Sequence, residues 1–143
     1  MQYSAMPRGE CIFCQIVKGE LPSRVVMESE TCMAFLDISP AGKGHTLVVP
    51  RQHYVDLFDI DPEVLGEVMK MSKEVGIFLD EKLSAEGSSL FQMNRSVGGQ
   101  TIFHFHIHIV PRWQNDALVD PWIETPASDD LLSGVFHELM DGK

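Results

Sequence analysis

Hydrophobic and polar positions alternate along this chain of 143 residues with two periods, and each period predicts a kind of element. Three segments rich in β-branched and apolar residues, VVMESE, TCMAFLDI and GHTLVVP, predict the strands of an antiparallel meander. After residue 61, apolar residues recur every three or four positions as far as Leu83, which predicts a long helix. Asp61 is expected to cap this helix, and Pro62 suits its first position because an N–H there would have no helical partner.

The segments on either side complete the predicted fold. CIFCQIVKGELP is typical of a short helix or turn that ends at Gly19 and Pro22. SLFQMN and IFHFHIHIVP are predicted strands joined by the turn RSVGGQ, and Ser128 is expected to open a short C-terminal helix. The expected fold is α+β, with an antiparallel sheet of about five strands, one long helix and short N- and C-terminal helices. We expect one domain over residues 1–143, with 1–10 as a flexible leader and 113–143 as a variable C-terminal region.

Composition and charge narrow the classes of partner. Hydrophobic residues make up 44% of the chain and charged residues 22%, as in soluble globular proteins. The formal charge of −10 argues against a nucleic-acid polymer as ligand, whereas a small anionic ligand remains compatible with it. No apolar run approaches the roughly 18 residues of a membrane helix. The first ten residues lack the apolar core of a secretory signal, so a cytoplasmic location is expected. Three cysteines in such a chain are expected to be reduced.

The stretch HFHIHIV contains three of the six histidines at alternating positions. On a strand, this alternation places His104, His106 and His108 on one face and the apolar residues between them on the other, toward the helices. Side chains two residues apart lie roughly 6.6–7 Å apart, so the imidazoles can surround a ligand of phosphate size or hold a catalytic metal. His45 at the start of one strand and His53 beyond its end at Pro50 are further candidates. Three unrelated surface histidines are a poor alternative for so dense a cluster.

The motif C-I-F-C places two thiols, Cys11 and Cys14, where both can reach one metal ion. Zinc takes four protein ligands at a structural site, so two histidines would have to complete the shell. A redox dithiol and two inert buried thiols are the alternatives, although no thioredoxin-like pattern surrounds the pair. Cys32 lies within a predicted strand and is expected to be a small buried residue.

These motifs together resemble the histidine triad (HIT) family of nucleotide hydrolases and transferases. The family signature H-x-H-x-H-x-x, with apolar residues at x, is matched by residues 104–110. CIFCQIVKGELPS, AFLDISPAGKGHTLVVPRQH and GGQTIFHFHIHIVPR also resemble blocks of the bacterial members, in the same order. The branch of the purine-nucleoside phosphoramidases is the most similar, followed by the dinucleoside polyphosphate hydrolases of the fragile-histidine branch. The resemblance implies a HIT-like fold and cleavage at the α-phosphate of a purine nucleotide.

The resemblance also implies a role for each catalytic position. His106 is the expected nucleophile, which would form a covalent nucleotidyl-histidine intermediate. His108 and His45 are expected to contact the α-phosphate and stabilise charge at the reacting centre. Thr101 matches a position that donates to the leaving group or the phosphate. In relatives that bind zinc, the first histidine of the signature turns toward the metal. The expected ligands of a structural zinc ion are therefore Cys11, Cys14, His53 and His104.

The same resemblance suggests residues that bind the nucleoside. Asp37 matches an acidic residue that holds the ribose hydroxyls. The remaining candidates are apolar positions around the base and polar or glycine positions of the NRSVGGQ loop: Phe13, Ile16, Phe35, Ile38, Asn94, Gly99 and Gln100. For the apolar positions, a plain core role is the alternative.

Three classes of function remain open. The first is the nucleotide hydrolase or transferase, acting on a phosphoramidate or a dinucleoside polyphosphate. The second is a metalloenzyme whose catalytic metal is held by His104, His106 and His108 together. The third is a nucleotide-binding regulatory protein whose hydrolysis is incidental. By resemblance we also expect a homodimer formed through the long helix and a strand. The C-terminal region with Trp113 and Trp122 is expected to affect leaving-group specificity or to pack as apolar surface.

Overall fold

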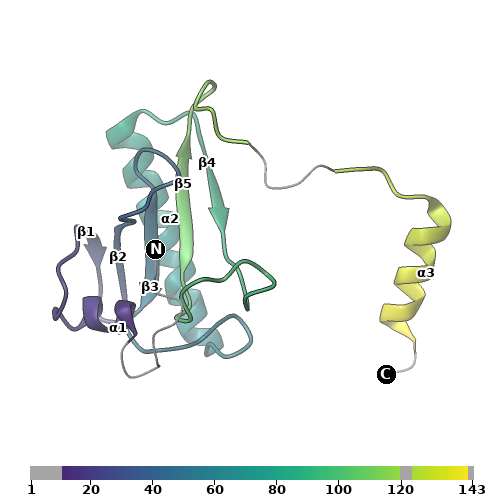
Figure 1. Cartoon of the computed structure of the whole chain (residues 1–143), viewed down its shortest axis with the longest axis horizontal. Coiled ribbons are helices and arrows are strands. Elements are labelled where there is room, and N and C mark those ends of the chain that lie inside the picture. Colours follow the sequence, from purple (N-terminus) through teal and green to yellow (C-terminus); the bar gives the residue numbers. More distant parts are fainter. Residues whose placement is uncertain (1–10, 120–123, 142–143) are drawn as a thin grey trace.

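A single antiparallel sheet organises the structure, a computed structural model that describes residues 11–119 and 124–141. Its five strands lie in the order β1-β2-β3-β5-β4, as Figure 1 shows. The strands are β1 (Val25–Glu28), β2 (Cys32–Leu36), β3 (Thr46–Pro50), β4 (Gly87–Phe91) and β5 (Ile107–Arg112). The helices are α1 (Ile12–Val17), α2 (Pro62–Leu83) and α3 (Asp129–Met140). The predicted α+β fold with a five-stranded antiparallel sheet is confirmed.

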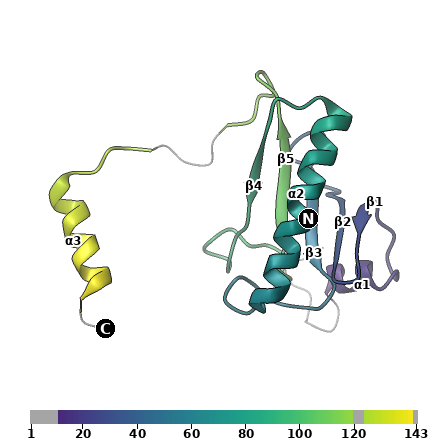
Figure 2. The same cartoon turned by 180° about the vertical axis from the view of Figure 1, so that it is seen from behind.

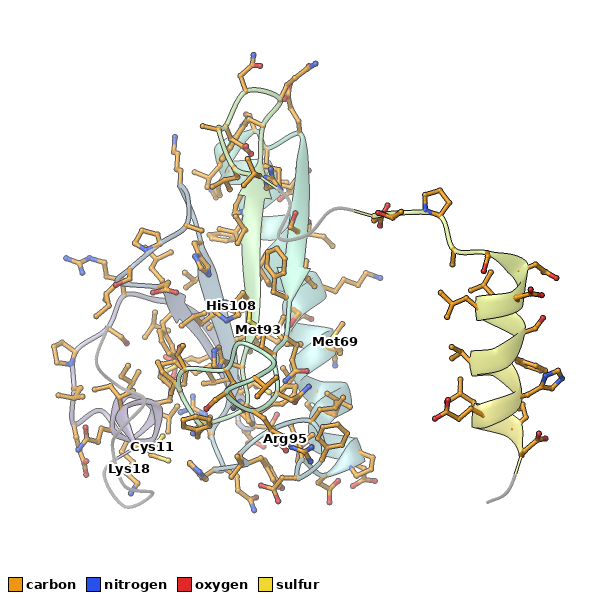
Figure 3. All side chains as sticks on the ribbon, turned by 45° about the vertical axis from the view of Figure 1, so that its right-hand side comes forward. Cys11, Lys18, Met69, Met93, Arg95 and His108 are labelled. Atoms are coloured by element: carbon orange, nitrogen blue, oxygen red, sulfur yellow. The ribbon has the colours of Figure 1, made fainter. Side chains whose placement is uncertain are left out.

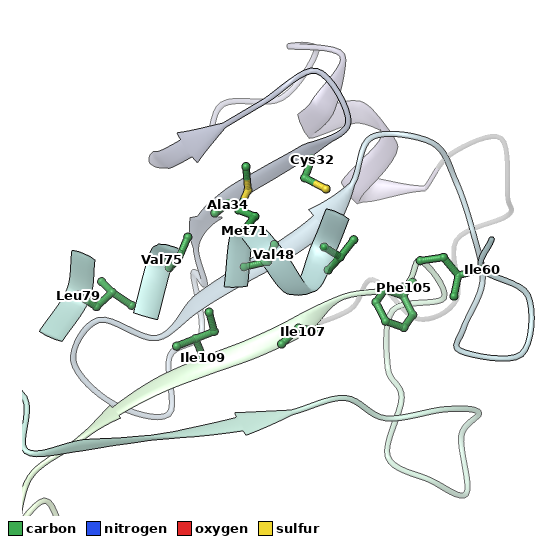
Figure 4. Close-up of a cluster of buried hydrophobic side chains, with 11 residues drawn as sticks. Cys32, Ala34, Val48, Ile60, Met71, Val75, Leu79, Phe105, Ile107 and Ile109 are labelled. Carbon is green, nitrogen blue, oxygen red and sulfur yellow. The ribbon is translucent and has the colours of Figure 1, made fainter. Parts of the chain in front are cut away.

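The long helix α2 covers one face of the sheet, which Figure 2 shows from the helix side. It begins as predicted, because the Asp61 carboxylate accepts the N–H of Glu63 at 2.8 Å and Pro62 occupies the first position. Its buried stripe packs on the apolar side chains that project from β2, β3, β5 and the segment just before β5 (Figure 4). Phe105, Ile107 and Ile109 belong to this core, so the alternation in HFHIHIV directs its apolar members toward the helix as predicted.

Within residues 11–119 and 124–141, the opposite face of the sheet is covered in part by the short helix α1. Met33, Phe35, Leu47 and Val49 alternate with the residues that face α2, and they pack with Phe13 in a second apolar cluster. The thiol of Cys11 caps α1 by accepting the N–H of Cys14 at 3.4 Å. Because α1 has six residues, it leaves part of this face open, and the candidate site occupies that part.

The strand predicted over residues 102–111 is wrong for its first five residues. β5 begins only at Ile107, which pairs with Val48 of β3. Further along β3, Pro50 has no N–H to donate, and its carbonyl oxygen lies 2.9 Å from Nε2 of the His104 ring. The chain before Ile107 therefore leaves the ladder, and this departure lets His104 and His106 take different surroundings.

The helix predicted after Ser128 is present as α3. The Ser128 hydroxyl accepts the N–H of Leu131 at 3.1 Å, and two acidic residues follow in the first turn. All twelve residues of α3 are exposed, and Figure 1 shows the helix apart from the sheet. None of the helices within 11–119 and 124–141 has the length and apolarity required to cross a membrane.

Candidate active site and metal site

A cavity of about 450 Å³ opens between α1, the ends of β2 and β3, and the segment that leads into β5. At one end it is lined by the imidazoles of His45, His106 and His108. Away from the histidines it is lined largely by apolar side chains. Nine predicted residues line it: Phe13, Ile16, Phe35, Asp37, Ile38, His45, Thr101, His106 and His108. Figure 3 labels His108, which lies on the sheet, and Cys11, which lies beside α1. Residues far apart in sequence thus meet at one cavity.

The ring of His106 is held by the backbone of the preceding turn. Its Nδ1 lies 2.7 Å from the carbonyl oxygen of His104. Because a carbonyl can only accept, Nδ1 carries the hydrogen, and the lone pair of the neutral ring is on Nε2. Phe13 contacts the ring edge-on, with the centroids 5.1 Å apart. Burial lowers the pKa of His106 below its usual value, so the ring stays neutral at pH 7. A neutral imidazole with a bare nitrogen at a cavity is a competent nucleophile.

His45 and His108 are the second pair of imidazoles at the cavity. Nε2 of His45 lies 3.0 Å from Nδ1 of His108 and 3.5 Å from Oδ2 of Asp37. Burial lowers the pKa of His45, although the Asp37 carboxylate opposes that shift. Burial, together with the neighbouring rings of His106 and His45, lowers the pKa of His108 to about 3. Both rings are therefore neutral at pH 7, and they can act on an anionic group only as hydrogen-bond donors.

A separate cluster contains the four predicted metal ligands. The ligand atoms of Cys11, Cys14, His53 and His104 all lie within 4.8 Å of one another. Nδ1 of His104 is 3.4 Å from the Cys11 sulfur and 3.6 Å from the Cys14 sulfur. Nδ1 of His53 is 3.2 Å from the Cys14 sulfur.

The chemistry of this cluster fits a metal ion. Nε2 of His104 donates to the carbonyl of Pro50, so the lone pair of its Nδ1 faces the sulfurs. Burial lowers the pKa of His104 to about 4, which keeps this nitrogen unprotonated at pH 7. Two sulfurs and two imidazole nitrogens are a donor set suited to a tetrahedral metal ion. The cluster can therefore hold a metal, as predicted.

The three histidines of the motif do not meet at a single metal position in the part of the chain that the structure describes. The ring of His104 faces the two cysteines, whereas His106 and His108 line the cavity. His106 also directs its Nδ1–H at a carbonyl. This arrangement gives no support to a catalytic metal shared by all three.

Three predicted nucleotide-binding residues lie in the 94–100 loop and do not line the cavity. Gln100 is buried, where its amide accepts the N–H of Arg95 at 2.7 Å and donates to the carbonyl of Val55 at 2.7 Å. Asn94 accepts the N–H of Leu57, also at 2.7 Å. Gly99 has a φ of +100°, and an added Cβ would lie 2.7 Å from the Met93 sulfur. These residues shape the loop that precedes Thr101.

Some cavity residues had no signal in the sequence. Leu21, Pro22, Ser23 and Ser39 also line the cavity, and all lie in loops outside the helices and strands. Ala41 contributes its backbone N–H, which lies 2.9 Å from Nδ1 of His45. The closeness of these segments to the predicted residues along the chain was the only indication of their role. A backbone N–H donor cannot be predicted from the type of its residue.

Comparison with known proteins adds an independent finding. A model of the HIT domain matches residues 18–115. The chain is 33% identical over 131 residues to the adenosine 5'-monophosphoramidase HNT1 of Saccharomyces cerevisiae, which covers 91% of this chain and 80% of that protein. It is 36% identical over 118 residues to the adenylylsulfatase HINT3 of Arabidopsis thaliana, which covers 80% of this chain and 58% of that protein.

Solved structures agree with the sequence comparison. A crystal structure from Streptococcus mutans superposes with a TM-score of 0.86 at 32% identity, over 95% of this chain and 85% of that one. A zinc-bound histidine triad family protein from Mycobacterium smegmatis superposes with a TM-score of 0.75 at 36% identity, over 80% and 85% of the two chains.

Proposed function

This chain belongs to the histidine triad (HIT) family, and from that premise we propose that it is a nucleotide hydrolase that cleaves purine nucleoside phosphoramidates or related nucleotides at the α-phosphate. The observation that carries the proposal is the fixed ring of His106. Its Nδ1–H donates to the carbonyl of His104 at 2.7 Å, so an unprotonated Nε2 is available at the cavity. A nitrogen held in this state can attack phosphorus without first losing a proton.

The reaction follows in two displacements. In the first, Nε2 of His106 forms a bond to the α-phosphorus while the bond from phosphorus to the leaving amine breaks, and the amine takes up a proton from solvent. In the second, water attacks the phosphorus of the nucleotidyl-histidine and gives a proton back to solvent, the bond to Nε2 breaks, and a nucleoside monophosphate leaves. Each step is easier than a single displacement by water. In this proposal the hydroxyl of Thr101, an exposed residue of the cavity lining, donates a hydrogen bond to the leaving group.

Negative charge on the phosphoryl oxygens must be stabilised in both steps. His45 and His108 are the neutral donors beside His106, whose ring centroid lies 4.7 Å from that of His108. Preorganised donors of this kind commonly account for the largest share of the rate enhancement. We assign His108 as the donor to the nonbridging oxygens of the α-phosphate, and His45, which was also predicted to contact the phosphate, as the residue that supports His108 through their hydrogen bond.

The rest of the cavity suits a nucleoside. We assign the ribose hydroxyls to the carboxylate of Asp37, which lines the cavity and lies 3.5 Å from Nε2 of His45. We assign the base to the apolar residues Phe13, Ile16, Phe35 and Ile38. Ile38 is 64% exposed, so its contact with a base would bury apolar surface. Asn94, Gly99 and Gln100 stay predicted contributors, through the loop that carries Thr101.

We further propose that the metal site holds a structural zinc ion. All four ligands would come from the protein, Cys11, Cys14, His53 and His104, so the ion would connect α1 to the segment that precedes β5. Bound there, zinc supplies folding stability. The zinc-bound relative from M. smegmatis supports this assignment. Thiols that bind metal must stay reduced, which agrees with the cytoplasmic location expected from the sequence.

A homodimer is the proposed assembly. The outer edge of β4 has no partner strand within the described sheet, and Ile77 and Leu90 are 50% and 46% exposed beside a groove between α2 and β4. An unpaired edge next to apolar surface favours association. Light scattering should give a mass near twice 16.1 kDa, and a mass near 16.1 kDa would refute the dimer.

The proposed activity is tested with a substrate panel. Adenosine phosphoramidates, adenosine phosphosulfate and a dinucleoside polyphosphate share the adenylyl half and differ in the leaving group. We expect the highest kcat/KM for a phosphoramidate, and release of AMP from it should be lost in His106→Gly. Preference for the dinucleoside polyphosphate would move the assignment to that class. Binding of AMP without turnover of any substrate would favour a regulatory protein.

A further inference from the structure

Asp37, His45 and His108 form a second group whose ligand atoms lie within 4.8 Å of one another. Two imidazoles and a carboxylate at these distances match a common set of ligands for divalent metals. The separations are like those of the cysteine-containing cluster, so distance alone does not distinguish a metal site from a hydrogen-bonded group. The hydrogen atoms on the rings do distinguish them.

The backbone fixes which nitrogen of His45 carries hydrogen. The N–H of Ala41 points at Nδ1 of His45 from 2.9 Å. A backbone amide can only donate, so Nδ1 must hold a lone pair and the hydrogen of the neutral ring is on Nε2. Nε2 accordingly faces two acceptors, Oδ2 of Asp37 at 3.5 Å and Nδ1 of His108 at 3.0 Å.

The position of the hydrogen on His45 in turn determines the position of the hydrogen on His108. Since Nε2 of His45 donates, Nδ1 of His108 accepts, and the hydrogen of the neutral His108 ring is on its Nε2. His108 lines the cavity next to His106. The chain of hydrogen bonds therefore begins at a backbone amide and makes His108 a donor at the cavity.

We propose that the backbone amide of Ala41 is a positioning group: it fixes His45 as the hydrogen-bond donor to His108 and His108 as the donor to the phosphate, and it prevents a divalent metal from binding to Asp37, His45 and His108. The role of the donors rests on the proposed hydrolase function, whereas the positions of the hydrogens and the exclusion of metal do not. With the opposite tautomer, Nε2 of His45 would present a lone pair. That lone pair could not donate to Nδ1 of His108, so His108 would lose the constraint that keeps its hydrogen on Nε2, and the lone pair would be free to bind a metal ion.

The loop that holds Ala41 is built to present this amide. The N–H of His45 donates to the carbonyl of Gly42 at 3.2 Å, which closes the turn. Gly44 has a φ of +83°, in the left-handed region, and an added Cβ there would lie 2.6 Å from a side-chain carbon of Leu83. The Ala41 side chain itself is exposed, so a proline at this position removes the amide N–H without disturbing a packed side chain.

The first test needs no variant. Nitrogen-15 NMR of the imidazoles separates protonated from unprotonated ring nitrogens, and His45→Gln and His108→Gln variants assign the signals. We expect hydrogen on Nε2 of both His45 and His108 in the wild-type protein at pH 7. Hydrogen on Nδ1 of either residue would overturn the proposal, whatever the substrate of the enzyme.

The second test removes the amide. Ala41→Pro has no N–H to donate, whereas the matched control Ala41→Gly retains it. We expect His45 in Ala41→Pro to gain a population with hydrogen on Nδ1, and kcat to fall on the order of tenfold or more with a smaller change in KM. Ala41→Gly should keep the wild-type tautomers.

Metal binding gives a readout that is separate from activity. With the cysteine site filled with zinc, Ala41→Pro should bind an additional equivalent of Co²⁺, detected by its visible absorption, and wild type and Ala41→Gly should not. Additional Co²⁺ bound by the wild-type protein, and lost in His45→Gln, would contradict the proposal. If the tautomers are as expected but no phosphoramidate is cleaved, the function fails and the assignment of the hydrogens stands.

Discussion

His104 and His108 lie four residues apart in one segment, but they belong to different clusters. The cysteine cluster of His104 and the cavity cluster of His108 use imidazole in opposite ways. In the cysteine cluster, Nε2 of His104 donates to the carbonyl of Pro50, so a lone pair on Nδ1 faces two sulfurs. At the cavity, the amide of Ala41 leaves His45 with hydrogen on Nε2 and, through it, makes His108 a donor. Both clusters have ligand atoms within 4.8 Å of one another. In each ring, the hydrogen-bond partner of one nitrogen therefore decides whether the other nitrogen presents a lone pair to a metal or a hydrogen to an acceptor.

The largest expected effect comes from removing the nucleophile at the cavity. His106→Gly should lower kcat for an adenosine phosphoramidate by at least on the order of 10⁴-fold, because no other group replaces a covalent nucleophile. The metal content should not change, since His106 is not a ligand of the cysteine cluster. Steady-state kinetics and elemental analysis of the same preparation check both points. Equal rates in wild type and His106→Gly would refute the enzyme proposal. Loss of metal in His106→Gly would show that the cavity and the cysteine cluster are not independent.

The next effect concerns the cysteine cluster. Cys14→Ser should lose most of the bound zinc and lower the Tm, because metal binding contributes folding free energy. Cys32→Ala is the matched control: Cys32 is fully buried in the core beside α2 and belongs to neither cluster. It should lower the Tm through lost packing while zinc is retained. Zinc content measured beside thermal unfolding separates the two. Full zinc occupancy in Cys14→Ser would refute the assigned ligand set.

A matched pair of histidine variants tests whether the two clusters act separately. His53→Gln should lower zinc content with a modest loss of kcat, whereas His45→Gln should lower kcat by about 10²-fold, the scale for loss of one charge-stabilising donor, and retain zinc. Kinetics and metal analysis of both proteins should therefore show that one variant loses mainly zinc and the other mainly activity. Parallel losses of zinc and activity in both variants would show that the separation is wrong.

The smallest effect is on pH dependence. The folded-state pKa of His108 is about 3, below the 6.5 of an unperturbed histidine, because burial disfavours the charged ring. The unfolded chain takes up a proton at higher pH than the folded protein, so this residue's share of the stability is present above pH 6.5 and is lost as pH falls from 6.5 toward 3. In an NMR titration the His108 ring should stay neutral at pH 5. A midpoint near 6.5 would show that the ring is solvated.

Much of the fold follows from local chemistry that the sequence displays. Asp61 and Pro62 begin α2 as predicted because capping and a fixed φ act within one turn. The β5 strand was predicted too long because its end depends on Pro50, a residue of another strand that has no N–H opposite the segment. The exposure of the apolar side of α3 could not be predicted from the sequence either, because periodicity shows that a helix has an apolar side but does not show what covers it.

The candidate site, like the fold, could be predicted from the sequence only in part. Residue types with specific chemistry, such as the cysteine pair and the alternating histidines, indicated both clusters before any coordinates. The backbone donors and acceptors that set the tautomers, at Pro50, His104 and Ala41, have no side-chain signature. Gln100 resembled a ligand residue by position, yet its amide is taken up by the loop backbone. Three-dimensional contacts therefore supplied what the sequence could not: which nitrogen each ring presents.

The most direct test of the central claim is to trap the intermediate. The protein is mixed with an adenosine phosphoramidate, quenched within one turnover, digested and analysed by mass spectrometry. We expect an adenylyl group on the peptide that contains His106, localised to that histidine and absent from His106→Gly. An adenylyl group on His45 or His108, or turnover with no adduct at the shortest times, would contradict it.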